Sequence, residues 1–248
     1  PFDSAVQGGD AVWEGLRLYD GRIFRLTEHL ARLRSSAKAL AFASIPTDEE
    51  ITEQIRRTLA ANKMRDGVHI RLTLTRGVKI TSGMDPRLNQ SGPTLIVLAE
   101  HKPPVYDKSG LRLITAGIRR IPPDCMDQKI HSCNLLNSIL AKAESANAGY
   151  EEAILLDERG FVCEGSGENI FVVKDGKVIT PPHVAAILDG INRKSVIQIL
   201  ADSGHDVEIR DLARSELYVA DEVFMCGTAA EVVPVREIDD HPLGEPGE

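Results

Sequence analysis

The segment HKPPVYDKSG, residues 101–110, places the strongest limit on the fold, because it divides the chain into two parts with different patterning. Its adjacent prolines and its glycine interrupt helices and strands alike, and several of its other side chains are charged. We therefore predict a smaller unit over residues 1–100, a linker over 101–110 and a larger unit over 111–248. The 248 residues, 42% of them hydrophobic, are enough for a core in each unit.

The first hundred residues indicate a small α+β unit. The run VWEGLRLYDGRIFRL is typical of two strands joined at Asp20 and Gly21, a residue pair that favours a tight hairpin turn. Thr27 is the expected N-cap of a first helix, and Thr47 with Glu50 predicts a capping box at the start of a second. Two strands rich in β-branched residues follow, in GVHIRLTLTRG and TLIVLAE.

The larger unit is predicted to be β-rich and barrel-like, because short strand patterns outnumber helices in it. The strands are expected in LRLITAGI, EAILLD, FVCEGSGENIFVVKDGKVIT and HDVEIRDL, with Asp175 and Gly176 at a second hairpin turn. One helix is expected to end at Gly149, and another, INRKSVIQILADSG, at Gly204. The predicted fold class is therefore α+β.

Composition and charge exclude several classes of function. The formal net charge is −8 and the basic residues are scattered, which argues against a nucleic-acid binder. No apolar run is long enough to span a membrane. The four cysteines have no C-x-x-C spacing, so we predict buried free thiols, no metal site and a cytoplasmic location.

Five stretches, taken together and in order, resemble the class IV aminotransferases, the fold-type IV pyridoxal-phosphate enzymes. The stretches are AVWEGLRLYDGRIFRLTEHLARL, HIR, NLLNSILAKAESANAGYEEAILLD, EGSGENIFVVKDG and YVADEVFMCGTAAEVVPV. The branched-chain amino acid aminotransferases are the most similar sub-type. The resemblance implies pyridoxal 5′-phosphate as cofactor, an amino acid and a 2-oxo acid as substrates, and a homodimer.

The family implies a lysine that forms a Schiff base with the cofactor. Its members place this lysine three or four residues before an Asn-(Tyr or Leu)-Leu sequence, which here begins at Asn134. His131 lies three residues before Asn134 and Lys129 lies five before it. We predict that Lys129 is the catalytic amine and that the loop holds one or two extra residues. The other possibility is a site that has lost its lysine, with His131 in that position.

The resemblance also assigns cofactor-binding residues. Glu164 would pair with the ring nitrogen, and the residue pattern alone would equally allow an exposed glutamate in a turn. The helix start at Ile191 and Asn192 would bind the phosphate, because free backbone N–H groups at a helix N-terminus attract anions. Thr228 and Arg32 would complete the phosphate site, although Arg32 could also be a surface residue of a helix.

Substrate contacts are predicted from the same resemblance. Arg71 matches an arginine near the substrate carboxylate, and His69 stands where branched-chain members have tyrosine. Trp13 matches an aromatic wall of the side-chain pocket. The turn at Ala229 and Ala230 would offer backbone N–H groups to a carboxylate.

Three functions are compatible with these residues. The predicted function is transfer of an amino group between an amino acid, branched-chain by the resemblance, and 2-oxoglutarate. A D-amino-acid transaminase or an aminodeoxychorismate lyase of the same fold is one alternative. A non-catalytic binding protein that keeps the fold is another, and the spacing of Lys129 and His131 separates it from the enzymes.

Overall fold

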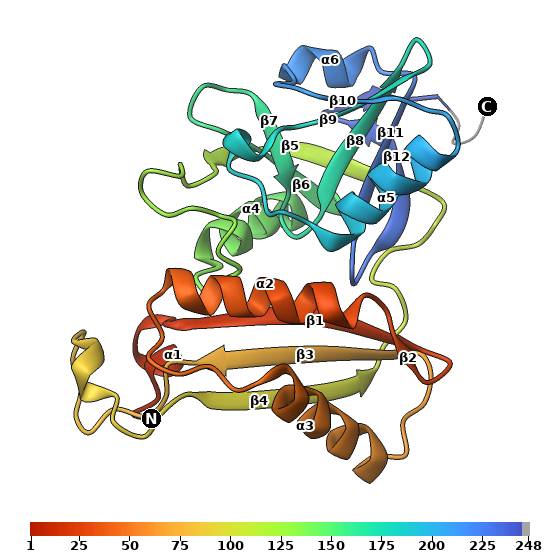
Figure 1. The fold of residues 1–248 in the computed structure, drawn as a ribbon. Helices are drawn as coiled ribbons and strands as arrows, with labels where there is room; N and C mark the ends of the chain where they lie inside the picture. Colours follow the sequence, from red (N-terminus) through yellow and green to blue (C-terminus); the bar gives the residue numbers. More distant parts are fainter. Residues whose placement is uncertain (245–248) are drawn as a thin grey trace. The chain divides into compact units, whose positions relative to one another are not determined.

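The structure, a computed structural model, describes residues 1–244, and the chain divides into two compact units (Figure 1). The smaller unit contains Pro1–Pro103 and Ile130–Asn134, and the larger unit contains Pro104–Lys129 and Leu135–Glu248. The division at Pro103 lies within the segment predicted to be a linker. No sequence feature predicted that residues 130–134 belong to the smaller unit.

The smaller unit is a four-stranded antiparallel sheet in the order β2-β1-β3-β4, with two long helices on one face (Figure 1). Its strands are β1 (Ala11–Tyr19), β2 (Arg22–Ile23), β3 (Val68–Thr75) and β4 (Thr94–His101), and its helices are α1 (Ser4–Gly8), α2 (Leu26–Ala39), α3 (Asp48–Ala61) and the 3₁₀ turn η1 (Pro86–Leu88). Apolar residues of α2, α3, β1 and β3 form one core, represented by Leu33, Ile55, Leu16 and Ile70.

Local signals in this unit were predicted with one error. Asp20 and Gly21 have φ angles of 46° and 75°, so the tight hairpin turn is confirmed. The capping box before α3 is confirmed as well. The predicted N-cap Thr27 is wrong, because α2 begins at Leu26 and its N-cap is Arg25, with a φ of 50°. The short link after β2 enters the helix through this left-handed residue, which leaves Thr27 inside the first turn.

The larger unit is a curled, mixed nine-stranded sheet in the order β10-β9-β8-β11-β12-β5-β6-β7, with β13 paired to β12. Its strands are β5 (Leu111–Arg119), β6 (Glu152–Leu156), β7 (Val162–Gly165), β8 (Asn169–Lys174), β9 (Lys177–Thr180), β10 (Val207–Ile209), β11 (Glu222–Gly227), β12 (Glu231–Ile238) and β13 (His241–Pro242). Its helices are α4 (Leu136–Asn147), α5 (Ile191–Asp202), α6 (Arg214–Tyr218) and the 3₁₀ turn η2 (His183–Ala185). The predicted α+β class is confirmed.

Along β6, β7 and the first part of β8 both faces of this sheet are buried, and alternate residues face different neighbours. Ile154 and Leu156 of β6 face the main core, whereas Ala153 and Leu155 pack with Ala141 of α4. Strands β8, β9 and β11 also have one face in the main core. Their other face, which includes Phe171, packs against α5. Strands buried on both faces read as continuous apolar runs, as EAILLD does.

Residues 130–134 add a short extended segment to the edge of β1. The Trp13 N–H donates to the His131 carbonyl at 2.9 Å, and the Cys133 N–H donates to the Ala11 carbonyl at 2.8 Å. Ser132 forms an isolated antiparallel bridge with Val12. These bonds fix which residues of the segment lie beside which residues of β1.

Within residues 1–244, no helix is long and apolar enough to cross a lipid bilayer, and no group of three or more His, Cys, Asp or Glu residues could hold a metal ion. The four cysteines are free thiols. Cys163 and Cys226 are buried, and burial raises the pKa of the Cys226 thiol to about 12. The prediction of buried thiols is wrong for Cys125, which is exposed because it lies in a turn.

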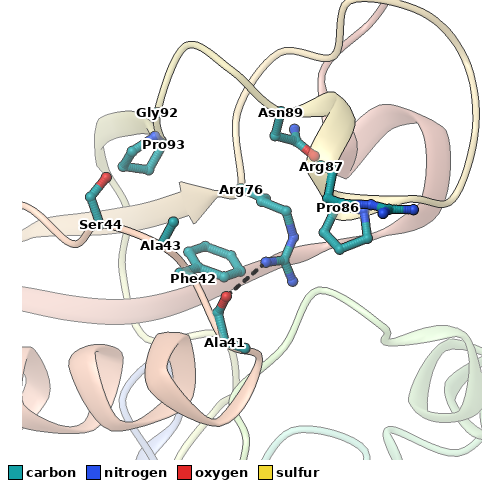
Figure 2. A pocket seen from close by; sticks show the side chains of 10 residues that line it. All are labelled: Ala41, Phe42, Ala43, Ser44, Arg76, Pro86, Arg87, Asn89, Gly92 and Pro93. Atoms are coloured by element: carbon teal, nitrogen blue, oxygen red, sulfur yellow. Dashed lines mark hydrogen bonds between the residues drawn. The ribbon is translucent and has the colours of Figure 1, made fainter.

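The smaller unit has a shallow pocket of about 280 Å³ between the loop after α2 and the segment around η1 (Figure 2). Arg76 crosses it and donates to the Ala41 carbonyl at 3.1 Å and to the Leu40 carbonyl at 2.7 Å. Its guanidinium also pairs with Asp10 and lies over the Phe42 ring. The pocket contains none of the predicted site residues, and Arg76 ties the end of α2 to β3.

Candidate cofactor and substrate residues

Glu164 is a buried carboxylate at the centre of a hydrogen-bond network in the larger unit, so it is not an exposed turn residue. It lies on β7 and is 3% exposed. Arg120 donates a short hydrogen bond to its Oε1, and the Leu188 N–H lies 3.1–3.2 Å from both oxygens. Asn169 donates to Oε2 at 2.8 Å. Because the Leu188 N–H is shared between both oxygens, these three donors make four hydrogen bonds with Glu164.

Two residues of this network were not predicted from the sequence. Arg120 follows β5 and is 8% exposed, and it also donates to the Ser138 hydroxyl at 2.8 Å. Burial raises the pKa of Glu164, and the Arg120 charge opposes that rise. Asn169 belongs to the motif EGSGEN, which could have identified it, but nothing in the sequence around Arg120 connects it with Glu164.

The start of α5 lies next to the same network. The Asn169 amide also donates to the Leu188 carbonyl at 3.2 Å. Gly190 is the N-cap of α5, and a Cβ there would lie 1.9 Å from the Asn169 Oδ1 atom. Only glycine allows this approach, which brings the helix start to Glu164.

The N-terminus of α5 has the features of an anion site. No side chain caps it. The first N–H groups of a helix lack partners within the helix, and here they belong to Ile191 and Asn192. The Asn192 Oδ1 atom is buried and has no hydrogen-bond partner within residues 1–244. Free N–H groups at an uncapped helix start fit a bound anion such as a phosphate, whereas the Asn192 Oδ1 atom is an acceptor and would not itself bind one.

Thr228, Ala229 and Ala230 form the turn between β11 and β12. Cys226, two residues before Thr228, lies opposite Asn169 in the ladder between β11 and β8. The turn therefore follows β11, which is paired with the β8 strand that carries Asn169. Ala230 is buried, and the Ala229 carbonyl accepts from the Val105 N–H at 3.0 Å.

In the smaller unit, Arg32 belongs to a buried charged cluster rather than to an exposed helix surface. Its Nε and Nη2 atoms donate to the two oxygens of Glu14 at 2.8 and 2.7 Å. Glu14 is fully buried and also lies 2.7 Å from His29 Nδ1. Burial raises the pKa of Glu14, but His131, Arg32 and His29 together hold it well below the usual range.

Trp13 and Arg71 lie side by side in the smaller unit. They come from neighbouring strands, and the Arg71 guanidinium lies 4.0 Å from the centre of the Trp13 ring. His69 is two residues before Arg71 on the same face of β3. Its Nδ1 atom is buried without a hydrogen-bond partner among the described residues, and burial lowers the pKa of His69.

Lys129 and His131 have different surroundings. Lys129 is in a turn, its side chain is 46% exposed, and its ammonium pairs with Asp127 at 2.8 Å. The His131 side chain is 11% exposed, and its ring centre lies 4.1 Å from that of Trp13. Its Nδ1 atom lies 3.4 Å from both Glu14 and Arg32. The histidine, and not the lysine, packs among the predicted site residues of the smaller unit.

A second buried acidic cluster lies in the larger unit, around Glu152 and Glu168. Glu152 is fully buried and accepts from Lys142 at 2.8 Å and from the Tyr106 hydroxyl. Glu168 packs against Gly227, just before the Thr228 turn. Burial and the neighbouring Glu152 charge raise the pKa of Glu168 to about 8.

We predict that Glu168 makes the stability of the larger unit depend on pH. Its pKa rises from 4.5 to about 8 on folding, so the unfolded state loses this proton more readily. Stability from this group is therefore complete below pH 4.5 and is lost as pH rises towards 8. Between about pH 6 and 9, the unfolding midpoint of the parent should fall by about 5 °C more than that of Glu168→Gln. The check is the unfolding midpoint measured across this pH range. If the midpoints of the parent and of Glu168→Gln fall by the same amount, Glu168 does not have the raised pKa.

The predicted residues thus form two groups, one in each unit. Glu164, Ile191 and Asn192 are linked through Asn169 in the larger unit. In the smaller unit, Trp13 and Arg32 contact His131, and Arg71 lies over the Trp13 ring. Glu14 and His29 were not predicted, and a buried Glu on an apolar strand was the signal that could have identified Glu14.

Comparison with known proteins identifies a family. The sequence profile described as "Amino-transferase class IV" matches residues 11–238. The branched-chain-amino-acid aminotransferase-like protein 2 of Arabidopsis thaliana is 55% identical over 245 residues, which cover 98% of this chain and 44% of that protein. The chain therefore spans about half the length of this curated relative.

Solved structures show the same fold. The branched-chain aminotransferase of Thermoproteus uzoniensis, determined with norvaline, has a TM-score of 0.93 and 35% identity, with 100% of this chain and 84% of that chain covered. The T.th. branched-chain amino acid aminotransferase, complexed with N-(5′-phosphopyridoxyl)-L-glutamate, has a TM-score of 0.89 and 41% identity, with 98% and 81% covered. The predicted resemblance and the fold-type IV architecture are confirmed.

Proposed function

Because this chain belongs to the class IV aminotransferase family, we propose that it transfers an amino group between an amino acid and a 2-oxo acid with pyridoxal 5′-phosphate as cofactor. The observation that carries the proposal is the buried Glu164 next to the uncapped start of α5. An acidic partner for a ring nitrogen and an anion site are two of the features that bind this cofactor.

The residues of the larger unit fit the cofactor. Glu164 would be the acidic partner of a ring N–H. Ile191 and Asn192 would hold the phosphate, with Thr228 as a further donor. When bound, the cofactor supplies an aldehyde for the substrate amine and an aromatic ring that accepts electrons as the substrate Cα loses its proton. Glu164 keeps a proton at the ring nitrogen, and Arg120 and Asn169 orient Glu164.

The smaller unit would contribute substrate contacts and a further charge. Glu14 holds the Arg32 guanidinium in a fixed orientation, which favours Arg32 as a phosphate ligand. Trp13 and Arg71 form a stacked pair, which would present an apolar surface beside a positive charge. This combination suits an amino acid with an apolar side chain and a carboxylate, with His69 on the same face of β3. From the family resemblance alone, we propose the N–H groups of Ala229 and Ala230 in the larger unit as further donors to the carboxylate.

We propose a branched-chain amino acid as the donor and 2-oxoglutarate as the acceptor. Two relatives support this choice, since both are branched-chain aminotransferases, and one was solved with norvaline, an apolar straight-chain amino acid, and the other with a phosphopyridoxyl derivative of glutamate. A screen of L- and D-amino acids with 2-oxoglutarate and added cofactor, following glutamate, tests it. L-Leucine, L-isoleucine and L-valine should give the highest rates. If glutamate forms only with D-amino acids, the donor is a D-amino acid and the branched-chain L-donor is wrong. If no donor yields glutamate, the proposal of transamination is refuted.

A non-catalytic binding protein is the second candidate function. The observation that favours it is His131, which lies among the site residues of the smaller unit while Lys129 pairs with Asp127 on the surface. Such a protein would bind the cofactor with a measurable affinity and produce no glutamate in the donor screen.

We also propose a homodimer. Leu136, Ile139 and Leu140 lie on one face of α4, and each is more than half exposed. Three large apolar side chains at this spacing favour contact with another surface. Light scattering should give twice the mass of one chain, and a single-chain mass at micromolar concentration would contradict the proposal.

We place the protein in the cytoplasm. The free state of all four cysteines supports a reducing compartment. Cell fractionation tests this location, and recovery in an oxidising compartment would contradict it.

A further inference from the structure

The segment 130–134 decides how the cofactor would be held, so the following inference rests on the proposed function. A covalent anchor requires a primary amine, because the nitrogen must lose two hydrogens to form a double bond to the aldehyde carbon. An imidazole has no nitrogen with two replaceable hydrogens. The identity of the side chain beside Trp13 and Arg32 therefore determines whether such a bond can form.

Hydrogen bonds to β1 place His131 at this position. The Trp13 N–H donates to the His131 carbonyl, and the Cys133 N–H donates to the Ala11 carbonyl. The Trp13 indole N–H also donates to the Ser132 carbonyl at 3.1 Å. A shift by one residue would break all three bonds. The side chain before His131, Ile130, packs against the apolar core of the smaller unit.

The His131 ring is held on two sides. Its face contacts Trp13, and its Nδ1 atom is directed at Glu14 and Arg32. These contacts leave Nε2 as the ring nitrogen that can meet a ligand. Burial lowers the pKa of His131, although Glu14 opposes this shift. A neutral ring can accept or donate a hydrogen bond at Nε2, depending on its tautomer.

Lys129 is bound to its own turn instead. Asp127 accepts from the Lys129 backbone N–H at 2.9 Å through Oδ1 and from the ammonium at 2.8 Å through Oδ2. In an extended strand, residues 129 and 131 would lie on the same face. Residues 128 and 129 are in a turn, so the Lys129 side chain does not follow this alternation. Lys142, the next lysine along the chain, is bound to Glu152 and Tyr106.

We propose that this chain holds pyridoxal phosphate by non-covalent contacts alone, with the His131 imidazole in the place where a covalent anchor would need an amine. One consequence is specific to this arrangement. Without a bond to the aldehyde, pyridoxal phosphate and pyridoxamine phosphate differ only in weak contacts. Their dissociation constants should agree within about threefold.

Equilibrium dialysis of both compounds against the parent, Lys129→Gln and His131→Lys tests the proposal. The parent and Lys129→Gln should show the same two dissociation constants. His131→Lys should bind pyridoxal phosphate about tenfold or more tightly than pyridoxamine phosphate, because it regains an amine. Borohydride treatment followed by peptide mass spectrometry should fix the cofactor to residue 131 of that variant only. Circular dichroism checks that the variant is folded.

The parent protein alone can overturn the proposal. A stoichiometric borohydride adduct on Lys129, prevented by excess pyridoxamine phosphate, would show that the lysine is the anchor. If that protein also forms glutamate in the donor screen, the proposed function stands and only the inference fails. If the parent binds neither compound, both the inference and the proposed function fail.

Discussion

Replacing Glu164 with glutamine is expected to lower the rate of transamination by about a hundredfold or more, the effect typical of removing one preorganised electrostatic contact. Glutamine keeps the shape of the side chain and can still accept from Arg120, but it carries no charge. A proton at the ring nitrogen would then lose its counter-charge. The dissociation constant of the cofactor should change by about tenfold or less, since the phosphate contacts remain. The rate is followed as glutamate formed from the best donor.

A matched variant separates this role from a loss of structure. Glu152→Gln also neutralises a fully buried carboxylate of the larger unit, on β6, next to the β7 strand that carries Glu164. It should affect stability more than the chemical step, because Glu152 contacts Lys142 and Tyr106 rather than the residues assigned to the ring nitrogen. Equal rate losses in the two variants, or a Glu164→Gln rate near that of the parent, would refute the assignment.

Features set by neighbouring residues could be predicted from the sequence. The hairpin turn at Asp20 and Gly21 needs only two residues that tolerate positive φ. The capping box needs only Thr47 and Glu50, three residues apart. Thr27 shows the limit of such local rules, since the geometry of the preceding link made Arg25 the N-cap.

Contacts between distant parts of the chain could not be predicted in this way. Arg120 lies 44 residues before Glu164, and no periodic pattern relates the two positions. The indole of Trp13 donates to a carbonyl 119 residues away, and this pairing is what places His131 beside β1. Motif spacing could identify Lys129 and His131 as the two candidate positions. Only the tertiary structure shows that the His131 ring is buried and the Lys129 ammonium is exposed.

Arg120 provides the largest expected effect on stability. Arg120→Met removes the charge but keeps an unbranched apolar side chain, and it leaves Glu164 buried without its ion-pair partner. The free energy of unfolding should fall by about 3–5 kcal/mol, the usual cost of breaking a buried ion pair from one side. The loss also reflects the Ser138 hydroxyl and Ala186 carbonyl, which would lose a donor. Urea unfolding followed by far-ultraviolet circular dichroism measures it, because the single tryptophan, Trp13, reports only on the smaller unit.

Two further variants identify the buried charge as the cause. Arg56→Met breaks an exposed ion pair with Glu53 on α3 and should leave the free energy of unfolding nearly unchanged. The double variant Arg120→Met/Glu164→Gln should regain part of the stability lost in Arg120→Met, because no unpaired carboxylate is left in the interior. If the double variant is less stable than Arg120→Met by the full cost of a second independent substitution, the two residues are not coupled. In that case Arg120 stabilises the larger unit through Ser138 and Ala186 instead of by holding Glu164.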